Sequence, residues 1–349
     1  MFGDGCRLLL KFWRVGDETL LEHVVKTTAV CRICSNSSGN EFYEVKEMMF
    51  GIGDKFKYFK CSECGCLQIL EIPEEIHKYY PSNYCSFTDP QSTKGLLHGF
   101  KQYLKNLRNK AIVSKRGFLG RLLQRVFPNQ VMELIARSGV NKDSRILDVG
   151  CGSGKLLLEL RSIGFTNLLG VDPYIEKTID YGNGLQIAKC SIIKLEEGNW
   201  DLIMFHHSLE HIPNPEDTLV KVSQLLSPEG KCLVRIPVVD SYAWKNYGVN
   251  WVQLDAPRHL FLHSRRSLDI LAKKAGLKIY EVVFDSWEFQ FWGSEQYVRG
   301  IPLCSSRSYS VSRKNSIFSR RDIRYFRQKA KELNETRQGD QAAFFLKKI

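Results

Sequence analysis

The chain has 349 residues, of which 43% are hydrophobic, so it is long and apolar enough for two domains that need no disulfides. No apolar run approaches the ~18 residues of a membrane span, and the apolar stretch at the N-terminus is too short for a secretory signal. We therefore expect a cytoplasmic chain, with peripheral membrane contact as an addition. Eleven cysteines, including two C-x-x-C pairs, favour metal binding in a reducing compartment over a disulfide framework.

The formal net charge of +12 is concentrated in two segments. Residues 91–127 contain nine Lys and Arg and no Asp or Glu, and residues 299–349 contain thirteen Lys and Arg against four acids. The rest of the chain is net negative. Such local charge indicates either an anionic partner or two solvated helical faces, and the sequence leaves both interpretations open.

Residues 1–30 show no clear pattern and are predicted to be an N-terminal extension, partly disordered. Residues 31–90 predict a zinc-ribbon module. Cys31-x-x-Cys34 and Cys61-x-x-Cys64 are separated by 26 residues, which a β-hairpin can fill. Four thiolates can enclose one tetrahedral Zn²⁺ with no open position, so the predicted role of the metal is structural. Cys66 is a spare thiol that could replace Cys64.

Residues 91–127 are predicted to form a basic helical connector, interrupted at Gly117 and Gly120. A tyrosine-rich stretch, 79–84, precedes it. These tyrosines either pack the ribbon onto the next domain, which we favour slightly, or form a wall of an acceptor pocket.

Residues 128–300 alternate between helical and strand patterns, which predicts an α/β fold with a Rossmann-like sheet and helices on both faces. Residues 301–349 are predicted to be a basic, helical C-terminal segment. The expected helices are 129–138, 155–163, 216–226 and 265–275, and the expected strands are 145–149, 168–171, 185–188, 200–205, 231–236 and 278–284.

A glycine-rich loop follows the first of these strands. The chain runs Asp148-Val149-Gly150-Cys151-Gly152-Ser153-Gly154, where glycines allow a tight turn and let a ligand lie against the backbone. Asp148 would repel a pyrophosphate and suits a cationic ligand. The second strand ends at Asp172, whose two oxygens could bind both hydroxyls of a ribose.

Together these motifs resemble the class I S-adenosylmethionine-dependent methyltransferases, of the type 11/23-like branch, over roughly residues 129–284. The resemblance implies S-adenosylmethionine as cofactor and assigns cofactor binding to the loop and to the strand ends around it. Where the family carries an Asp for the adenine amine, this chain has Ser191, which could serve through its hydroxyl. The implied cofactor residues are Asp148, Gly150, Cys151, Gly152, Gly154, Asp172, Ser191 and His206.

The fourth strand is followed by a second family-like motif, Leu209-Glu210-His211-Ile212-Pro213. The overlapping H-x-x-E-H pattern that starts at His207 resembles an inverted zinc-protease motif. We disfavour that interpretation because the histidines directly follow a strand and the prolines prevent a long helix, and we expect one or both of His207 and His211 to shape the cofactor pocket instead.

Residues 244–261 resemble the W-x-x-L-D-x-P-R-H-L run of a bacterial branch associated with surface polysaccharides. More loosely, they resemble the H-E-H-Y-S turn of sugar C-methyltransferases, which also carry a two-C-x-x-C zinc module. The second resemblance places His259 on the catalytic histidine of those enzymes. Histidine titrates near working pH, so we predict His259 as general base, with His211, Glu210 and Asp255 as rivals.

Three functions remain open from the sequence. The leading one is methyl transfer to a small-molecule saccharide, nucleotide-linked or lipid-linked, with an anionic membrane surface as a further partner. The second is an RNA methyltransferase that uses the ribbon and the basic segments as a nucleic-acid surface. The third is a non-catalytic zinc-ribbon interaction protein.

Overall fold

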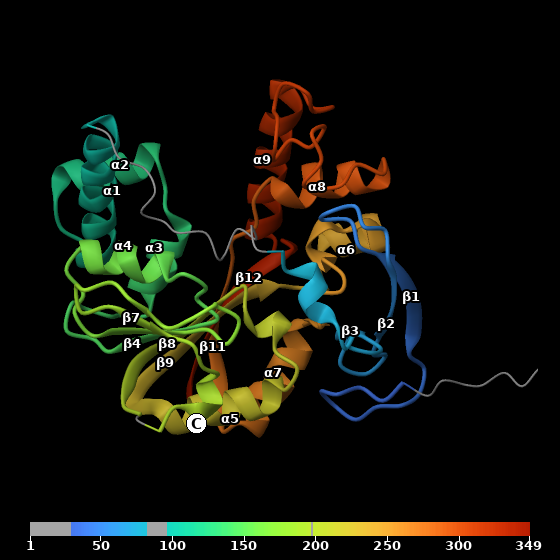
Figure 1. Cartoon of the computed structure of the whole chain (residues 1–349), viewed down its shortest axis with the longest axis horizontal. Helices are drawn as coiled ribbons and strands as arrows, with labels where there is room; N and C mark the ends of the chain where they lie inside the picture. Colours follow the sequence, from blue (N-terminus) through green and yellow to red (C-terminus); the bar gives the residue numbers. More distant parts are fainter. Residues whose placement is uncertain (1–28, 82–95, 197) are drawn as a thin grey trace, which may run out of the picture.

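The computed structural model describes residues 29–81, 96–196 and 198–349. The predicted N-terminal extension, up to residue 28, and Tyr84 lie outside the described residues. An eight-stranded sheet with the order β11-β12-β9-β8-β4-β5-β7-β6 forms the centre of the fold (Figure 1). The strands are β4 (Ile146–Val149), β5 (Leu168–Val171), β6 (Ile179–Asp180), β7 (Gln186–Ala188), β8 (Trp200–His206), β9 (Leu226–Pro237), β11 (Leu277–Phe284) and β12 (Gln341–Lys348).

Helices cover both faces of this sheet, as predicted. Strands β7, β5, β4, β8 and β9 are parallel neighbours, and their buried side chains alternate between two hydrophobic clusters. Helices α3 (Gln130–Arg137) and α4 (Lys155–Ser162) close one cluster, whereas α5 (Pro215–Leu225) and α7 (Arg265–Lys274) close the other. The Rossmann-like α/β fold is thus confirmed, with each predicted element between residues 129 and 284 present.

The C-terminal segment differs from the prediction. Helix α9 (Arg320–Glu335) is helical as expected, but β12 is a strand that pairs antiparallel with both β9 and β11. The sheet therefore extends beyond residue 300 and includes nearly the end of the chain. The run from Ala342 to Leu346 is entirely buried, and a short apolar run of this kind cannot be assigned to strand or helix from periodicity alone. Helix α8 (Phe289–Val298) lies between β11 and α9 in the chain.

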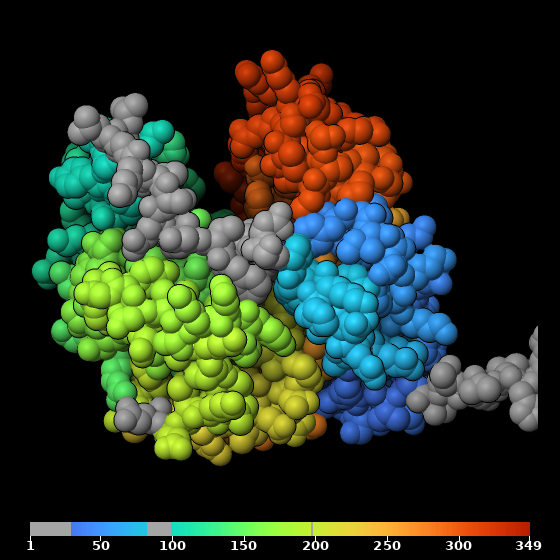
Figure 2. Space-filling view, viewed as in Figure 1, coloured from blue at the N-terminus to red at the C-terminus, as the bar shows by residue number. Residues whose placement is uncertain are grey.

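The N-terminal module shares its sheet with the rest of the chain. Strands β1 (Glu41–Lys46), β2 (Lys55–Lys60) and β3 (Leu67–Ile69) form an antiparallel meander, and β10 (Phe261–Leu262) pairs with β3 as a fourth strand. Figure 2 shows the module, in blue, packed against the C-terminal part of the chain, in orange. Backbone bonds from Leu303 to Met48 and from Cys304 to Met49 join them there.

The connector consists of two helices, α1 (Leu96–Ser114) and α2 (Phe118–Val126). The predicted break at Gly117 is present, but the predicted break at Gly120 is wrong. Gly120 lies inside α2 at the contact with α1, where an added Cβ would lie 2.4 Å from the Cβ of Ala111. The glycine therefore permits close helix packing. The remaining helix is α6 (Tyr242–Tyr247), and the 3-10 segments are η1 (Ile76–Tyr79), η2 (Ile192–Lys194), η3 (Leu209–His211), η4 (Gly248–Asn250) and η5 (Val252–Leu254).

Candidate active site

The order of the sheet reverses between β4 and β8, because the chain leaves β4 for β5 on one side and later returns to β8 on the other. Ligands of open α/β sheets bind outside the carboxyl ends of the strands at such a point. A cavity of about 1730 Å³ lies there. Its wall contains most of the residues predicted for the site, whereas Gly152, Gly154 and Glu210 are adjacent in sequence to wall residues and do not themselves line it. The predicted residues in the wall are Asp148, Gly150, Cys151, Asp172, Ser191, His206, His211, Asp255 and His259.

The glycine loop turns sharply between β4 and α4. Gly150 and Gly154 have left-handed backbone angles, with φ of 71° and 74°. A Cβ on Gly150 would lie 2.5 Å from the Cβ of Ser208, and one on Gly154 would lie 2.4 Å from Cδ1 of Ile187. Both positions thus need glycine for backbone angle and for space. The result is a backbone wall on which a ligand can lie.

Asp172 follows β5 and is tied to the glycine loop. Its Oδ2 accepts a hydrogen bond from the amide of Gly152 at 2.8 Å, and its Oδ1 accepts one from the amide of Tyr174 at 2.8 Å. Each carboxylate oxygen keeps a further lone pair, so an oriented acceptor stands at the cavity wall. This arrangement fits the two neighbouring hydroxyls of a ribose.

Asp148 is buried at the end of β4, with 3% of its surface exposed. Burial, and then the negative charge of Asp172, raises the pKa of Asp148 to about 8. A cationic group in the cavity would favour the ionised form of this carboxyl. The site therefore suits the ammonium of S-adenosylmethionine better than a phosphate.

Ser191 and His206 also lie in the cavity wall. The Ser191 hydroxyl caps η2 by accepting from the amide of Ile193 at 3.3 Å, and its proton is still able to reach a ligand. Both ring nitrogens of His206 are buried without a hydrogen-bond partner. Burial, followed by the charge of Arg235, lowers the pKa of His206 to about 3, so this ring is neutral at neutral pH.

Glu210 is fully buried behind the cavity wall, and neither of its carboxylate oxygens has a hydrogen-bond partner. Burial acts to raise its pKa, but the neighbouring His207, His211 and His259 outweigh burial and lower the pKa of Glu210 to about 2. Nδ1 of His207 lies 3.4 Å from Oε1 of Glu210, with His207 in a left-handed conformation at φ 54°. From the sequence we expect one or both of His207 and His211 to shape the cofactor pocket, and both line the cavity.

His259 lies just after η5, with its ring oriented by the backbone. Nδ1 is 2.7 Å from the carbonyl oxygen of Gln253, which can only accept, so Nδ1 carries the hydrogen and Nε2 the lone pair. Nε2 is 3.9 Å from Oε1 of Glu210 and 4.0 Å from Oδ2 of Asp255. Burial, and then the neighbouring His211, lowers the pKa of His259 to about 4. The ring is thus an unprotonated acceptor at neutral pH.

His211 is held in the same way. Its Nδ1 lies 2.8 Å from the carbonyl oxygen of Arg258 and 3.1 Å from the hydroxyl of Tyr80. The rings of His211 and His259 meet edge to face at 4.7 Å between centroids. Glu210, His211 and His259 offer ligand atoms within 4.8 Å of one another, so this cluster could move a proton or hold a divalent cation.

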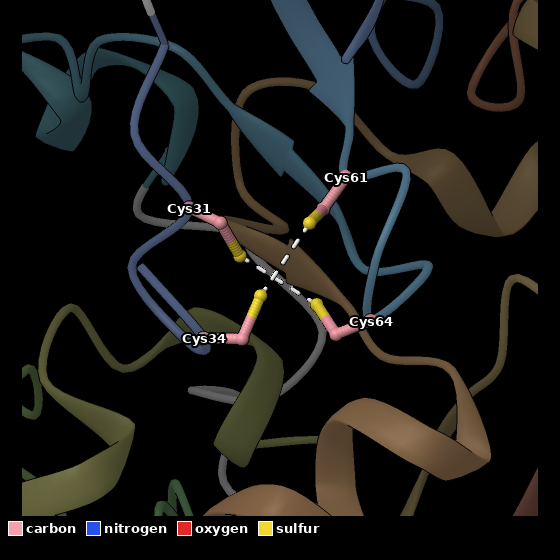
Figure 3. A group of neighbouring side chains, drawn as sticks. All are labelled: Cys31, Cys34, Cys61 and Cys64. Atoms are coloured by element: carbon pink, nitrogen blue, oxygen red, sulfur yellow. Dashed lines mark hydrogen bonds between the residues drawn. The ribbon is translucent and has the colours of Figure 1, made fainter. Parts of the chain in front are cut away.

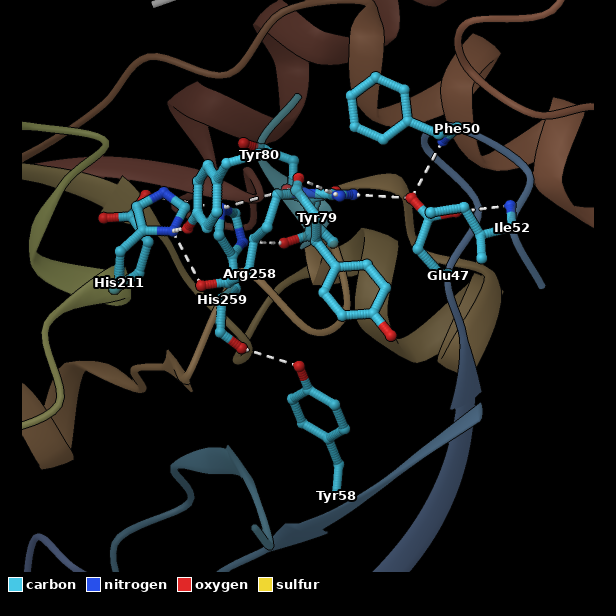
Figure 4. A network of polar contacts seen from close by, with 12 residues as sticks. Glu47, Phe50, Ile52, Tyr58, Tyr79, Tyr80, His211, Arg258 and His259 are labelled. Carbon is cyan, nitrogen blue, oxygen red and sulfur yellow. Dashed lines mark hydrogen bonds and ion pairs between the residues drawn. The ribbon is translucent and has the colours of Figure 1, made fainter. Parts of the chain in front are cut away.

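A polar network joins this cluster to the N-terminal module (Figure 4). Arg258 is fully buried and forms ion pairs with Asp255 at 2.6 Å and Glu47 at 3.1 Å. Its guanidinium also donates to the carbonyl oxygen of Tyr79 at 3.2 Å, and the hydroxyl of Tyr58 donates to the carbonyl oxygen of His259 at 2.8 Å. The carboxylate of Asp255 is thus paired with Arg258, and the N-terminal module positions the backbone of His259 through Tyr58.

The tyrosine stretch serves both of its predicted alternatives. Tyr79 is buried, packs edge to face on Phe56 and donates to Asp54, within the module. Tyr80 lines the cavity and stacks on Tyr174 at 6.1 Å between centroids. The side chain of Tyr79 therefore packs within the ribbon, whereas Tyr80 contacts the α/β part through Tyr174 and His211 and forms part of the cavity wall.

The four cysteines of the two C-x-x-C pairs converge on one point (Figure 3). Their sulfur atoms lie within 4.8 Å of one another, with 3.5 Å between Cys31 and Cys64 and between Cys34 and Cys61. Cys66 is not part of this cluster, since its sulfur lies 4.0 Å from Nδ1 of His263. Four thiols at this spacing fit the tetrahedral coordination of Zn²⁺.

Comparison with known proteins agrees with this geometry. A family model described as "Methyltransferase domain" matches residues 116–282. Residues 116–282 form a methyltransferase domain of the S-adenosylmethionine-dependent class I type. This domain is similar to ubiquinone biosynthesis O-methyltransferases from Dechloromonas aromatica, at 30% identity over 40% of this chain and 66% of the relative, and from Nitrosococcus oceani, at 34% identity over 29% of this chain and 46% of the relative.

The chain spans less than two thirds of the length of these curated relatives. Solved structures similar to the chain include a methyltransferase from Archaeoglobus fulgidus, with 18% identity, a TM-score of 0.38 and coverage of 65% of this chain and 98% of that one. A cyclopropane synthase from Mycobacterium tuberculosis has 15% identity, a TM-score of 0.39 and coverage of 62% and 83%. Among the described residues, no helix is both long and apolar enough for a bilayer crossing.

Proposed function

We propose that the chain transfers a methyl group from S-adenosylmethionine to a hydroxyl oxygen of a small saccharide acceptor, with His259 as general base. The observation that supports this most directly is the unprotonated Nε2 of His259, in the wall of the cavity that the glycine loop and Asp172 also line. One cavity thus offers a donor site and a proton acceptor. The two curated relatives reported above are named O-methyltransferases, which favours oxygen as the methylated atom.

The donor half of the site comes from the ends of β4 and β5. Asp172 would bind the ribose hydroxyls, Asp148 would face the ammonium, and the loop from Gly150 to Gly154 would lie under the ligand. Ser191 and His206 would border the same ligand. S-adenosylmethionine, when bound, supplies a methyl group on a positively charged sulfur, which is a good leaving group.

The acceptor half comes from His259 and its neighbours. As the acceptor oxygen forms its bond to the methyl carbon and the carbon–sulfur bond breaks, the hydroxyl proton passes to Nε2 of His259. The carbonyl of Gln253 keeps the tautomer that makes this transfer possible, and the negative charge of Glu210 stabilises the imidazolium that forms. His211 and Glu210 act as positioning residues in this proposal.

The cavity wall also indicates the class of acceptor. Lys105 and Arg108 of α1 line the cavity and offer positive charge to a phosphate-bearing molecule. Together with the resemblance of residues 244–261 to a polysaccharide-associated branch, this favours a nucleotide-linked or lipid-linked sugar in surface-polysaccharide or related biosynthesis. A lipid-linked acceptor would bring the chain to an anionic membrane surface.

We also propose that Cys31, Cys34, Cys61 and Cys64 hold one structural Zn²⁺. The converging sulfur atoms support this assignment, and a small module with short strands gains much of its stability from such a metal. Metal analysis should give one zinc per chain. A metal-free preparation that stays folded would refute the assignment.

A labelled-methyl transfer screen over nucleotide sugars, lipid-linked sugars, free glycans and RNA tests the proposed function. Label is expected in a sugar acceptor, and transfer to RNA alone, with strongly salt-dependent affinity, would establish the alternative RNA methyltransferase. Asp172→Ala should abolish binding of S-adenosylhomocysteine in calorimetry. A wild-type chain that binds neither donor nor product would exclude methyl transfer and leave a zinc-ribbon interaction protein.

A further inference from the structure

Helix α2 exposes its apolar residues to solvent. Phe118 is 80% exposed and Val126 is 62% exposed, and Leu119 and Leu122 are exposed between them. Surface helices normally turn such a stripe toward the core. Five large apolar side chains in ten consecutive residues, counting Phe127, form an exposed patch of the kind that marks an interaction site.

The orientation of the helix accounts for this exposure. Gly120 is the buried residue of α2, and it contacts Ala111 and the carbonyl of Leu107 on α1. Residues 118, 122 and 126 follow one another at four-residue spacing, on the side of the helix opposite Gly120. The face of α2 that packs on the protein is therefore the one that carries Gly120, and the face with the large apolar side chains points to solvent.

Charge indicates what this face contacts. Lys115, Arg116, Arg121 and Arg125 lie in or beside α2, and residues 99–127 contain no Asp or Glu. A second copy of this chain would bring like charges together, and RNA would gain little from Leu and Val side chains. An anionic lipid surface takes both components, because the apolar side chains enter the acyl boundary and the basic ones meet lipid phosphates.

We propose that α2 is an interfacial helix that docks the chain on anionic phospholipid, with Phe118, Leu119, Leu122 and Val126 inserted. The docking helix is also connected to the cavity. Arg108 lines the cavity and donates a hydrogen bond to the carbonyl oxygen of Phe127, just after α2. Helix α1 thus carries the docking helix on one side and forms part of the cavity wall on another. Delivery of a lipid-linked acceptor by this arrangement rests on the proposed function, whereas lipid binding itself does not.

Vesicle sedimentation with the full chain tests the proposal. Binding to vesicles of phosphatidylcholine with phosphatidylglycerol should exceed binding to phosphatidylcholine alone and should weaken in high salt. Phe118→Ser with Leu122→Ser should remove binding to both. Arg121→Glu with Arg125→Glu should lower affinity for the anionic vesicles by roughly tenfold or more, since each basic residue near such a surface contributes about fivefold.

A matched control comes from α9, which is also basic and carries Tyr325 with 63% of its surface exposed. Tyr325→Ser and Arg321→Glu with Arg324→Glu should leave vesicle binding unchanged. All variants should bind S-adenosylhomocysteine as the wild type does, which separates lipid docking from the donor site and from misfolding. Binding that survives the α2 changes, or is lost with the α9 changes, would overturn the assignment. So would a dimer that dissociates on the α2 changes without any wild-type affinity for vesicles.

Discussion

Lowering the pH from 7.5 to 6 should weaken the binding of S-adenosylhomocysteine, because Asp148 must lose a proton to pair with the ammonium of this ligand. The carboxyl is buried, and burial together with Asp172 raises its pKa to about 8. In the free protein it is therefore mostly protonated below pH 8. Pairing with a cation requires the ionised form, so binding should release this proton.

The size of the effect follows from the pKa. If only the ionised form binds, affinity falls by the factor 1 + 10^(8 − pH), which is roughly 100 at pH 6 and about 4 at pH 7.5. The dissociation constant should thus change by about 25-fold across this interval, equivalent to about 2 kcal/mol.

Titration calorimetry in two buffers of different ionisation enthalpy measures both affinity and released protons. The wild type should release about one proton at pH 6 and about three quarters of a proton at pH 7.5. Asp148→Asn should bind more weakly at pH 7.5 and lose most of the pH dependence. Asp143→Asn, an exposed position in the same domain, serves as the matched control and should keep it. A wild-type affinity that is flat between pH 6 and 7.5, or a slope retained by Asp148→Asn, would refute the reasoning.

Four further predictions concern turnover and stability. His259→Gln should keep S-adenosylhomocysteine affinity and lower turnover by roughly 100-fold or more, as for loss of a general base; wild-type turnover that is lost with EDTA and restored by Mn²⁺ would instead make His259 a cation ligand. Burial holds His206, His259 and His263 neutral in the folded chain, with pKa values of about 3, 4 and 4, so the unfolded chain binds more protons below pH ~6.5 and stability is lost as the pH falls. Between pH 7 and pH 5, each of the three histidines lowers the free energy of unfolding by about 2 kcal/mol, whereas the raised pKa of Asp148 increases it by about 3 kcal/mol. Urea unfolding should therefore show a net loss of about 3 kcal/mol, and equal free energies of unfolding at the two pH values would contradict this. Glu47→Gln should remove one partner of a buried ion pair and destabilise the chain by about 3 kcal/mol, with turnover reduced and S-adenosylhomocysteine affinity within twofold of wild type by calorimetry. Removal of zinc by a strong chelator should lower turnover more than donor affinity, and restored activity on addition of Zn²⁺ would exclude irreversible unfolding.

The sequence was sufficient where a feature is encoded locally. The glycine loop and Asp172 stand at the ends of short apolar strands, and the cysteine pairs carry their spacing within a few residues. The structure brings the glycine loop and Asp172 together, because the fold places the ends of neighbouring parallel strands side by side, and it brings the four cysteines to one point. Their roles in binding the donor and a metal remain predictions. The strand pattern between residues 145 and 284 was equally clear.

Features that depend on distant pairing were not accessible in this way. β12 is a strand because it lies between β9 and β11, and its own residues, with no alternation, fit a helix as well. Glu47 acquires its role only through Arg258, more than 200 residues later in the chain. His207 could be expected near the cofactor pocket, but nothing in the sequence marks the left-handed turn that sets its ring beside Glu210.

The pairing of β10 with β3 joins the acceptor half of the site, but not the donor half, to the sheet of the N-terminal module. β10 begins two residues after His259. The hydrogen bonds from Tyr58 to the carbonyl of His259 and from Arg258 to the carbonyl of Tyr79 join this segment to the N-terminal module. The donor half, by contrast, is held by β4, β5 and the glycine loop, through the hydrogen bonds of Asp172 to Gly152 and Tyr174, and the module reaches it through the stacking of Tyr80 on Tyr174. Loss of the module should therefore release the base from its position while the donor site persists. Zinc chelation and Glu47→Gln both disturb the N-terminal module and so test whether the two halves of the site are independent. If either change reduced donor affinity as strongly as turnover, the two halves would not be independent.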